Sequence, residues 1–394
     1  MQCKYRSNKG RCILKVKFNT KSLYSIFVFL LIVMYMFETS AIPNFSNSTI
    51  HDMIQYTALL IVIVYIIIRK YPIKELIRIF GLILIGALCY LSSGFSGLLM
   101  TMLVITLMPK NYLDTILHMI LKEEIFLFIV IIGLALIGIL DIGSLEINKG
   151  AYTTSGIALG FSHPNMLAAQ GTAIILLYLC VNRYRLKLRH YVISIIGVIL
   201  LFGCSKGRTS LFLGLFAIIL IGVANKNNVK KKILKVLPYV YIMVLLTVIL
   251  AMALYAKDNG TSVVSKFIND GIFNGRIGLA YRSLLAYPFT LFGKAIDFSI
   301  WNQYQYFVLD NGQVMVLLEF GIVGFLAYFY IIQTMLNEIK KEKEVVFGIV
   351  LIVFLIWSMY EGTMYFVGKN FALLFLGSKD INILLNFRNK GGKL

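Results

Sequence analysis

Long apolar segments separated by short polar loops recur along nearly the whole chain. Within each segment the apolar residues are continuous rather than alternating, over lengths near those of membrane-crossing α-helices. Because lipid offers the backbone no hydrogen-bond partner, continuous apolar runs favour helices over a closed barrel. The pattern predicts twelve spans, at residues 23–38, 53–68, 79–92, 94–108, 125–140, 164–181, 191–204, 209–224, 237–255, 311–332, 345–360 and 363–377. The last is short and carries Lys369, so eleven spans are the alternative.

One loop is much longer than the others, and we expect it to lie outside the cell membrane. It comprises residues 256–310, between two predicted spans. Long loops in compact proteins are usually functional or disordered, and this one has apolar residues at helical spacing: Ile277, Ala280, Tyr281, Leu284 and Leu285. Asn274 is a suitable N-cap and Pro288 ends the pattern near Tyr287. We therefore expect a short amphipathic helix on the outer membrane surface.

Composition and charge support an all-α polytopic membrane protein that forms a single integral membrane domain, residues 1–394. The mean hydropathy is +0.82, and charged residues make up only 14% of the chain. The net charge of +20 suggests nucleic acid, but most cations lie in alternate loops and in two basic tails, 1–22 and 378–394. This bias predicts a cytoplasmic-membrane location with both termini cytoplasmic, and no nucleic-acid partner.

Nine cations fall on the opposite, outer side, against the usual loop bias. They are Lys149, Lys206, Arg208, Lys257, Lys266, Arg276, Arg282, Lys294 and Lys369. Arginines in such places suggest an anionic partner. Arg276 and Arg282 are six residues apart, about 240° around a helix axis, so we expect them to have different roles. The cysteines and histidines are dispersed, and no disulfide framework or metal-binding spacing is present.

The segment at residues 203–210, with sequence GCSKGRTS, predicts a tight outer turn between two spans. Gly203 and Gly207 permit unusual backbone angles and close approach, and Lys206 and Arg208 add hydrogen-bond donors. Such a turn is suited to hold an anion at the membrane surface. The alternative is a plain hairpin whose cations reach lipid headgroups.

The segment at residues 160–170, with sequence GFSHPNMLAAQ, opens the predicted sixth span. Pro164 suits the first turn of a helix and Ser162 can cap it. His163 then lies beside a helix N-terminus, where the helix dipole disfavours the charged ring and leaves a neutral acceptor. A purely structural hydrogen bond from His163 is the alternative.

The segment at residues 309–324 carries acidic groups where the long loop returns to the membrane. Asp310 and Asn311 come just before the predicted span, and Glu319 lies inside it, where a carboxyl group is costly unless paired or facing a cavity. Gly321 and Gly324 predict close helix packing. Asp310 also suits a helix N-cap, so it has both a structural and a chemical interpretation.

Taken in order, these segments resemble the O-antigen polymerase/ligase family. The shared features are many spans, one large late outer loop, GFSHPN at a span start, an S-x-G-R-T-S turn and an N-G-R segment. The family's ligases carry H-[NSQ]-x9-G-x-x-[GTY] at the end of the loop. Here Asp310, Asn311, Gly321 and Gly324 keep that spacing, with Asp310 in place of the histidine. With Asp310 in place of the histidine, the chain is more similar to the Wzy-type polymerases than to the ligases.

The resemblance implies a GT-C-like helical fold and a membrane glycosyltransferase of capsule, exopolysaccharide or O-antigen synthesis. Its donor and acceptor would be undecaprenyl-diphosphate-linked oligosaccharides, with no cofactor and no metal. Arg208, Arg276, Arg282 and Lys206 would bind the diphosphate, Asp310 would be the catalytic base, and His163 the second candidate. Arg276 would also assist catalysis. Implied partners are membrane lipids and a flippase and chain-length regulator of the same pathway.

Two other functions remain as alternatives. An O-antigen-ligase-type enzyme would transfer finished polymer to another acceptor. A lipid-linked oligosaccharide or polysaccharide transporter belongs to a different class, and would be expected to show repeated halves and charges at mid-membrane. The chain has no repeat, and its unusual cations gather on one side, which favours an active site on one face.

Overall fold

The computed structural model describes residues 19–69, 71–148, 153–296 and 309–378, which are nearly all helical. The first helices are α1 (Thr20–Glu38), α2 (Thr49–Arg69), α3 (Ile73–Ser93), α4 (Gly97–Leu107) and α5 (Leu113–Leu136). A hairpin of β1 (Ser144–Asn148) and β2 (Thr153–Ile157) leads to α6 (Pro164–Val181), α7 (Leu188–Ser205) and α8 (Arg208–Val223). Then follow α9 (Asn227–Val236), α10 (Val240–Asp258), α11 (Val263–Lys266), α12 (Arg276–Ala286), α13 (Gly312–Glu342), α14 (Val345–Trp357) and α15 (Leu374–Gly377).

Within the described residues, seven helical segments are long and apolar enough to cross a membrane, and α4, α8 and α14 are shorter apolar helices. Their exposed surfaces are rich in leucine, isoleucine and phenylalanine, as expected of helices that face lipid. The prediction of an all-α polytopic membrane protein is confirmed at this level. The sixth predicted span, 164–181, coincides with α6 residue for residue.

One end of the bundle is defined by basic residues, and we call it the basic end. Arg183, just after α6, pairs with Asp114 of α5 at 2.7 Å and with Glu344 before α14 at 3.3 Å. Arg69 at the end of α2 donates to the carbonyl oxygen of Leu107, the last residue of α4, at 2.9 Å. These contacts join ends of α2, α4, α5, α6 and α14. These ends would lie on the same side of a membrane if successive helices crossed it in alternate directions.

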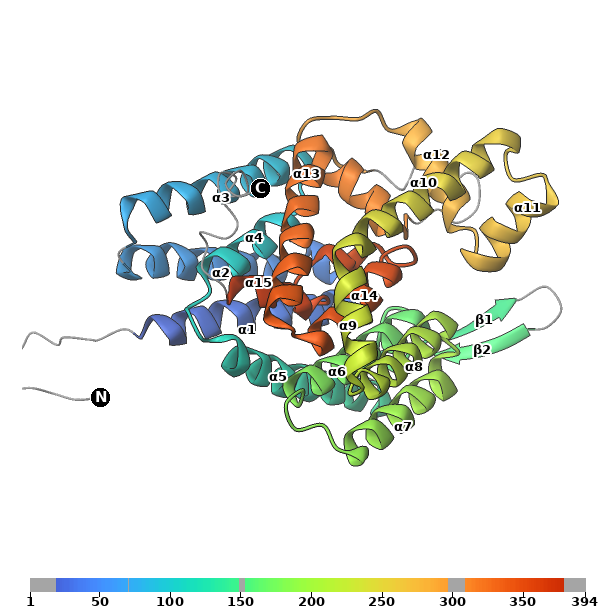
Figure 1. Cartoon of the computed structure of the whole chain (residues 1–394), viewed down its shortest axis with the longest axis horizontal. Coiled ribbons are helices and arrows are strands. Elements are labelled where there is room, and N and C mark those ends of the chain that lie inside the picture. Colours follow the sequence, from blue (N-terminus) through green and yellow to red (C-terminus); the bar gives the residue numbers. More distant parts are fainter. Residues whose placement is uncertain (1–18, 70, 149–152, 297–308, 379–394) are drawn as a thin grey trace, which may run out of the picture.

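The opposite end gathers the other helix termini. The N–H of Ala41, after α1, donates to the carbonyl of Gly160 at 2.8 Å, and the N–H of Ser162 donates to Thr39 at 2.9 Å. The segment just before α6 is therefore held against the end of α1. In Figure 1 the hairpin and α11–α12 lie on the right, while α2 and α3 extend to the left.

The hairpin packs against the start of α6 and the end of α7. Its strands are antiparallel, with Leu145 opposite Gly156. A Cβ atom on Gly156 would lie 2.5 Å from the carbonyl oxygen of Ser205 and 3.2 Å from the Cβ of Pro164. Only a glycine allows β2 to approach the end of α7 and the start of α6 this closely.

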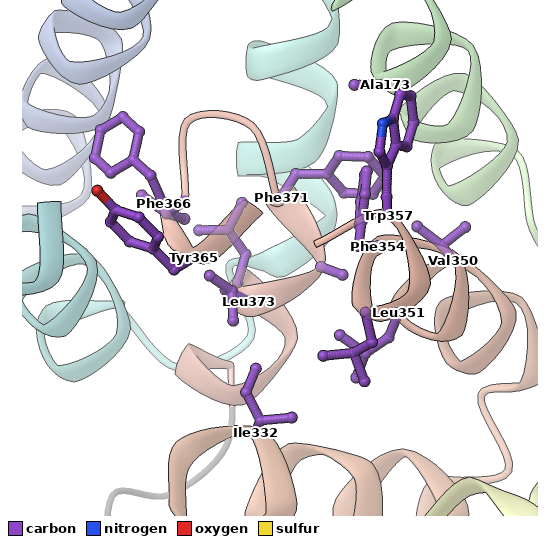
Figure 2. Close-up of a cluster of buried hydrophobic side chains, with 14 of the residues drawn as sticks. Ala173, Ile332, Val350, Leu351, Phe354, Trp357, Tyr365, Phe366, Phe371 and Leu373 are labelled. Carbon is purple, nitrogen blue, oxygen red and sulfur yellow. The ribbon is translucent and has the colours of Figure 1, made fainter. Parts of the chain in front are cut away.

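The predicted helical span at 363–377 is wrong in its local structure. The described chain after α14 forms 3₁₀ turns at Gly362–Tyr365 and Phe371–Leu373, followed by the single turn α15. This terminal segment is nevertheless almost wholly buried, and its apolar side chains pack against α13 and α14 in one cluster (Figure 2). Phe354 and Phe371 lie edge to face, with ring centroids 5.4 Å apart. Such packing stabilises a segment without a continuous helix.

Helix α13 is broken at Gly321, which has φ 69° and ψ −174°. Backbone from the long loop fills the break: the N–H of Ile322 donates to Thr290 at 3.0 Å, and that of Lys294 donates to Leu318 at 3.2 Å. A Cβ on Gly321 or on Gly293 would overlap the facing backbone. The close helix packing predicted for Gly321 and Gly324 is confirmed at Gly324, which lies against Cys89 of α3 and Leu98 of α4, whereas the partner of Gly321 is a loop.

The long loop contains α11, a π-helical turn at Phe267–Ile272, and α12. The predicted amphipathic helix is present as α12, but Asn274 does not cap it. Asn274 adopts a left-handed conformation with φ 51°, and Gly275 precedes the first helical residue, Arg276. The tails 1–22 and 378–394 lie outside the described residues except for residues 19–22 and Ser378, as does 297–308 within the loop.

Candidate functional site

Arg276 is the first residue of α12, and its guanidinium is held by two elements far from it in sequence. Its Nε donates to the carbonyl oxygen of Tyr360 at 2.8 Å, and its terminal amine pairs with the carboxylate of Asp310 at 3.1 Å. The ring of Tyr360 stacks on Phe273, one turn before α12, with centroids 5.4 Å apart. The Arg276 side chain is only 12% exposed. This planar fork is thus fixed in one orientation.

Asp310 does not cap the helix that follows it. The buried side chain of Asn311 does so, accepting from the N–H groups of Gln313 and Val314 at 3.2 Å each. The structural interpretation of Asp310 is therefore wrong, because the helix donors are already satisfied by its neighbour. Its carboxylate is left to face Arg276 instead.

The surroundings of Asp310 favour proton uptake. Burial and the nearby negative charge of Glu361 raise the pKa of Asp310 to about 6, while Arg276 and Lys369 oppose that shift. Its side chain keeps 24% exposure, so it remains accessible to a ligand. A carboxyl group with a pKa near 6 can accept a proton at neutral pH and is a better base than an ordinary aspartate.

Glu361 and Lys369 form a buried ion pair that the sequence reasoning did not assign to the site. Their charged atoms lie 3.3 Å apart, and the Lys369 side chain is 1% exposed. The sequence pattern placed Lys369 among the outer cations and inside the short last predicted span, and it did not single out Glu361. The available signal was two charges inside an otherwise apolar segment, since charged groups at membrane depth usually have a functional or paired role.

His163 lies beside this cluster and caps α6. Its Nδ1 accepts from the N–H of Asn165 at 3.0 Å, so the cap is His163 rather than the predicted Ser162. Burial lowers the pKa of His163, and the charge of Arg276 acts in the same direction while Glu361 opposes it. The ring is therefore neutral near pH 7, in agreement with the predicted neutral acceptor.

The turn between α7 and α8 packs against the first turn of α6. A Cβ on Gly207 would lie 2.8 Å from the Cβ of Ala168 and 3.9 Å from the side-chain oxygen of Asn165. Gly203 is an ordinary helical residue, and Lys206 adopts the left-handed conformation with φ 57°. The unusual angles expected at the two glycines are absent, whereas the close approach expected of them is confirmed at Gly207.

Arg208 is the first residue of α8 and is exposed, with no side-chain hydrogen bond capping that helix. Lys206 lies over the ring of Phe202, 5.9 Å from its centroid. Arg282 points elsewhere, and donates to the hydroxyl of Tyr255 on α10 at 3.3 Å. The expectation that Arg276 and Arg282 differ in role agrees with this divergence.

Helices α12 and α13 begin at this site, α6 begins beside it, and α8 begins next to the first turn of α6, with Arg208 and Arg276 as the first residues of α8 and α12. Free N–H groups and the helix dipole make such starts electropositive, and they suit an anion. Described residues include no group of three His, Cys, Asp or Glu side chains arranged to hold a metal ion. Arg276 and Asp310 combine a held guanidinium with a carboxyl group of raised pKa, which suits a transfer reaction on an anionic ligand.

No protein-family model, curated protein or solved structure matches this chain.

Proposed function

We propose that this protein is a polysaccharide polymerase of the cytoplasmic membrane. It joins oligosaccharide repeat units carried on undecaprenyl diphosphate, on the outer face, into a capsular, exo- or O-antigen polysaccharide. The observation that carries the proposal is the Arg276–Asp310 ion pair at the start of two helices, with His163 beside it. These are three of the residues that the family resemblance selects.

In the proposed reaction, the growing chain is the donor and the next lipid-linked unit is the acceptor. Asp310 takes the proton from the acceptor hydroxyl, whose oxygen forms a bond to the anomeric carbon of the donor. The bond from that carbon to the diphosphate oxygen breaks, and the lipid diphosphate leaves with the electron pair. Arg208 and Arg276 stabilise the charge that grows on this leaving group. The donor is already activated, so no nucleotide is consumed.

Asp310 suits the base better than His163. The carboxylate faces the exposed side of the site, whereas the His163 Nδ1 is already occupied by the α6 N–H of Asn165. Arg208 suits first contact with the diphosphate, because it is exposed beside a helix start whose N–H groups lack a side-chain cap. Arg276 lies deeper and would act on the leaving group.

The proposed topology has twelve crossings and a GT-C-like fold, with residues 358–377 as the last crossing in non-helical form. Support comes from Gly377, where a Cβ would lie 2.9 Å from the carbonyl oxygen of Ile105, near the basic end of α4. Since Tyr360 lies at the site and Gly377 lies at the basic end, this segment runs the length of the bundle. Both termini would then be cytoplasmic.

The test is polymerisation of a defined undecaprenyl-diphosphate-linked repeat unit by the purified full-length protein. We expect a ladder of longer lipid-linked chains, with linkages identified by mass spectrometry. A cell lacking the protein should accumulate single lipid-linked units on the outer face. Accumulation on the inner face would instead indicate a transporter, and accumulation of long lipid-linked chains would indicate a ligase.

A further inference from the structure

Two ion pairs lie side by side at the site and form what we call the four-charge cluster: Arg276, Asp310, Glu361 and Lys369. Asp310 feels the charges of all three other members. The cluster contains two positive and two negative groups, so its charges balance while Asp310 is ionised. A balanced cluster attracts an incoming anion only weakly, although it contains two cations.

We propose that Asp310 acts as a latch on Arg276, and that Glu361 and Lys369 are positioning residues for this latch. While Asp310 is ionised, it holds one edge of the Arg276 fork. When it takes up the proton of the acceptor hydroxyl, that edge is released to the departing lipid diphosphate. The inference rests on the proposed function, and it couples the base to the leaving-group donor.

The geometry of Arg276 makes such a release possible without movement of the backbone. Its Nε is bonded to the carbonyl of Tyr360 and its terminal amine to Asp310. A carbonyl oxygen cannot be protonated near neutral pH, so the Nε bond persists when Asp310 becomes neutral. The guanidinium therefore keeps its position while its terminal donors become available for bidentate contact with phosphate oxygens.

Protonation also changes the charge of the cluster. With Asp310 neutral, one negative group faces two positive groups, and the site gains a net charge of about +1 by simple counting. This gain occurs at the moment when negative charge moves onto the diphosphate. Interactions that strengthen in the transition state accelerate a reaction, whereas equal binding of substrate and transition state does not.

Glu361 and Lys369 are held where they can set the charge around Asp310. The backbone of the terminal segment packs tightly on the start of α13: the N–H of Gly312 donates to the carbonyl of Ser358 at 2.7 Å. A Cβ on Gly312 would lie 3.0 Å from the carbonyl of Glu361. The groups that face Asp310 are thus Arg276 from α12 and Glu361 and Lys369 from the terminal segment, while His163 of α6 faces Arg276 and Glu361.

The test measures the affinity of the purified full-length protein for geranylgeranyl diphosphate by calorimetry between pH 5 and pH 8. In the unmodified protein, we expect binding to be about tenfold tighter at the acid end, since a charge-assisted hydrogen bond becomes available to the ligand. Asp310→Asn should bind tightly throughout and show only the ligand's own titration. Asp270→Asn, an equivalent change at an exposed aspartate that accepts from Asn269 rather than pairing with Arg276, should behave like the unmodified protein.

If Glu361 and Lys369 position the charges around Asp310, their substitution should shift the pH at which the affinity for the diphosphate changes. Glu361→Gln removes a negative charge near Asp310, so the midpoint of the pH transition in binding should move to lower pH, whatever the change in affinity at either end. If that variant is not recovered in folded form, Glu361→Gln with Lys369→Met removes both buried charges. Because Glu361 acts on Asp310 more strongly than Lys369 does, a smaller shift in the same direction is expected.

Failure of the latch and failure of the proposed function give different results. If Asp310→Asn makes no polymer but binds the diphosphate no more tightly than the unmodified protein at pH 8, the latch is wrong and the polymerase stands. If Asp310→Asn binds more tightly, yet the unmodified protein makes no polymer from a lipid-linked unit, the latch stands and the polymerase is wrong. If the pH of the binding transition were unchanged in both Glu361 variants, Glu361 and Lys369 would not be positioning residues.

Discussion

Arg276, the first residue of α12, forms a 3.1 Å ion pair with Asp310, which stands just before the capping residue of α13. The pair therefore joins the start of α12, within the long loop, to the residue at which the loop returns to α13. It also places a guanidinium and a carboxyl base within one contact of each other. Most of the proposed chemistry depends on this relationship.

Arg276→Lys keeps the positive charge but loses the planar fork. A lysine ammonium cannot reproduce the fixed Nε bond to Tyr360 together with the pair to Asp310. We expect the rate of in vitro polymerisation to fall about 100-fold, as for loss of one oxyanion donor. Lys257→Gln, which removes an exposed cation at the same end of the bundle, is the control and should retain full activity.

Arg208→Lys tests the exposed contact to the diphosphate. Since Arg208 has an open position at the start of α8, we expect its loss to raise KM for the lipid-linked donor about tenfold, with a smaller effect on kcat. Steady-state kinetics with varied donor concentration make this measurement. Unchanged KM and kcat in this variant, at equal protein level, would remove Arg208 from the site.

The pH dependence of polymerisation follows from the raised pKa of Asp310. Burial and Glu361 bring this pKa to about 6, and the base works as the carboxylate. We therefore expect kcat/KM to be constant above pH 7 and to fall about tenfold per pH unit well below 6. A profile that stays flat down to pH 5, with a folded protein, would contradict Asp310 as base.

His163 has a capping role that can be separated from any catalytic one. His163→Asn keeps a side-chain acceptor for the N–H of Asn165, whereas His163→Ala loses it and should cost about 1 kcal/mol of stability. We expect the asparagine variant to polymerise nearly normally. Full loss of activity in a stable His163→Asn protein would show that the ring itself takes part in the reaction.

The buried pair of Glu361 and Lys369 predicts a non-additive effect on stability. Lys369→Met leaves the Glu361 carboxyl without its 3.3 Å partner in a site that is nearly closed to water, which should cost about 3 to 5 kcal/mol. Adding Glu361→Gln should restore much of that loss, because no buried charge is left unpaired. Thermal unfolding in detergent, compared among the three proteins, measures the coupling.

Gly321→Ala should disrupt the break in α13. The residue has a positive φ, and a Cβ there would overlap the backbone of Leu291 and Gly293. We expect a loss of about 3 kcal/mol or more, seen as a lower unfolding temperature or a reduced membrane level. Gly133→Ala in α5 is the matched control, since its Cβ would meet no atom within 4 Å, and it should be neutral or slightly stabilising.

The helical elements were predictable because each depends on local apolar runs. The predicted start and end of α6 are correct, and the main helix of the long loop was found from its spacing, with Pro288 near its end. The predicted helical span at 363–377 was wrong for the same reason. Its apolar residues resemble a span, yet its buried packing and the Glu361–Lys369 pair stabilise a non-helical path. Hydropathy alone does not distinguish these two cases.

At the candidate site, the sequence identified the residue types but not their partners. Arg276, Asp310 and His163 were selected, and the structure brings them together, while Arg282 turns to Tyr255. The caps were misassigned by one residue at α6, α12 and α13, because cap preference does not distinguish neighbouring polar residues. Glu361 was missed because its role depends on contacts made across the bundle.

The break in α13 also has a consequence for how the chain assembles during synthesis. The backbone groups of Leu318, Ile322 and Val323 obtain their partners from residues 290–294, and the carbonyl of Gly293 in turn accepts from Ser92 of α3 at 2.6 Å. Unpaired backbone groups are costly in lipid, so α13 is not stable there on its own. We therefore expect α13 to reach its final form only after the loop has closed onto α3, which would complete the site late in biogenesis.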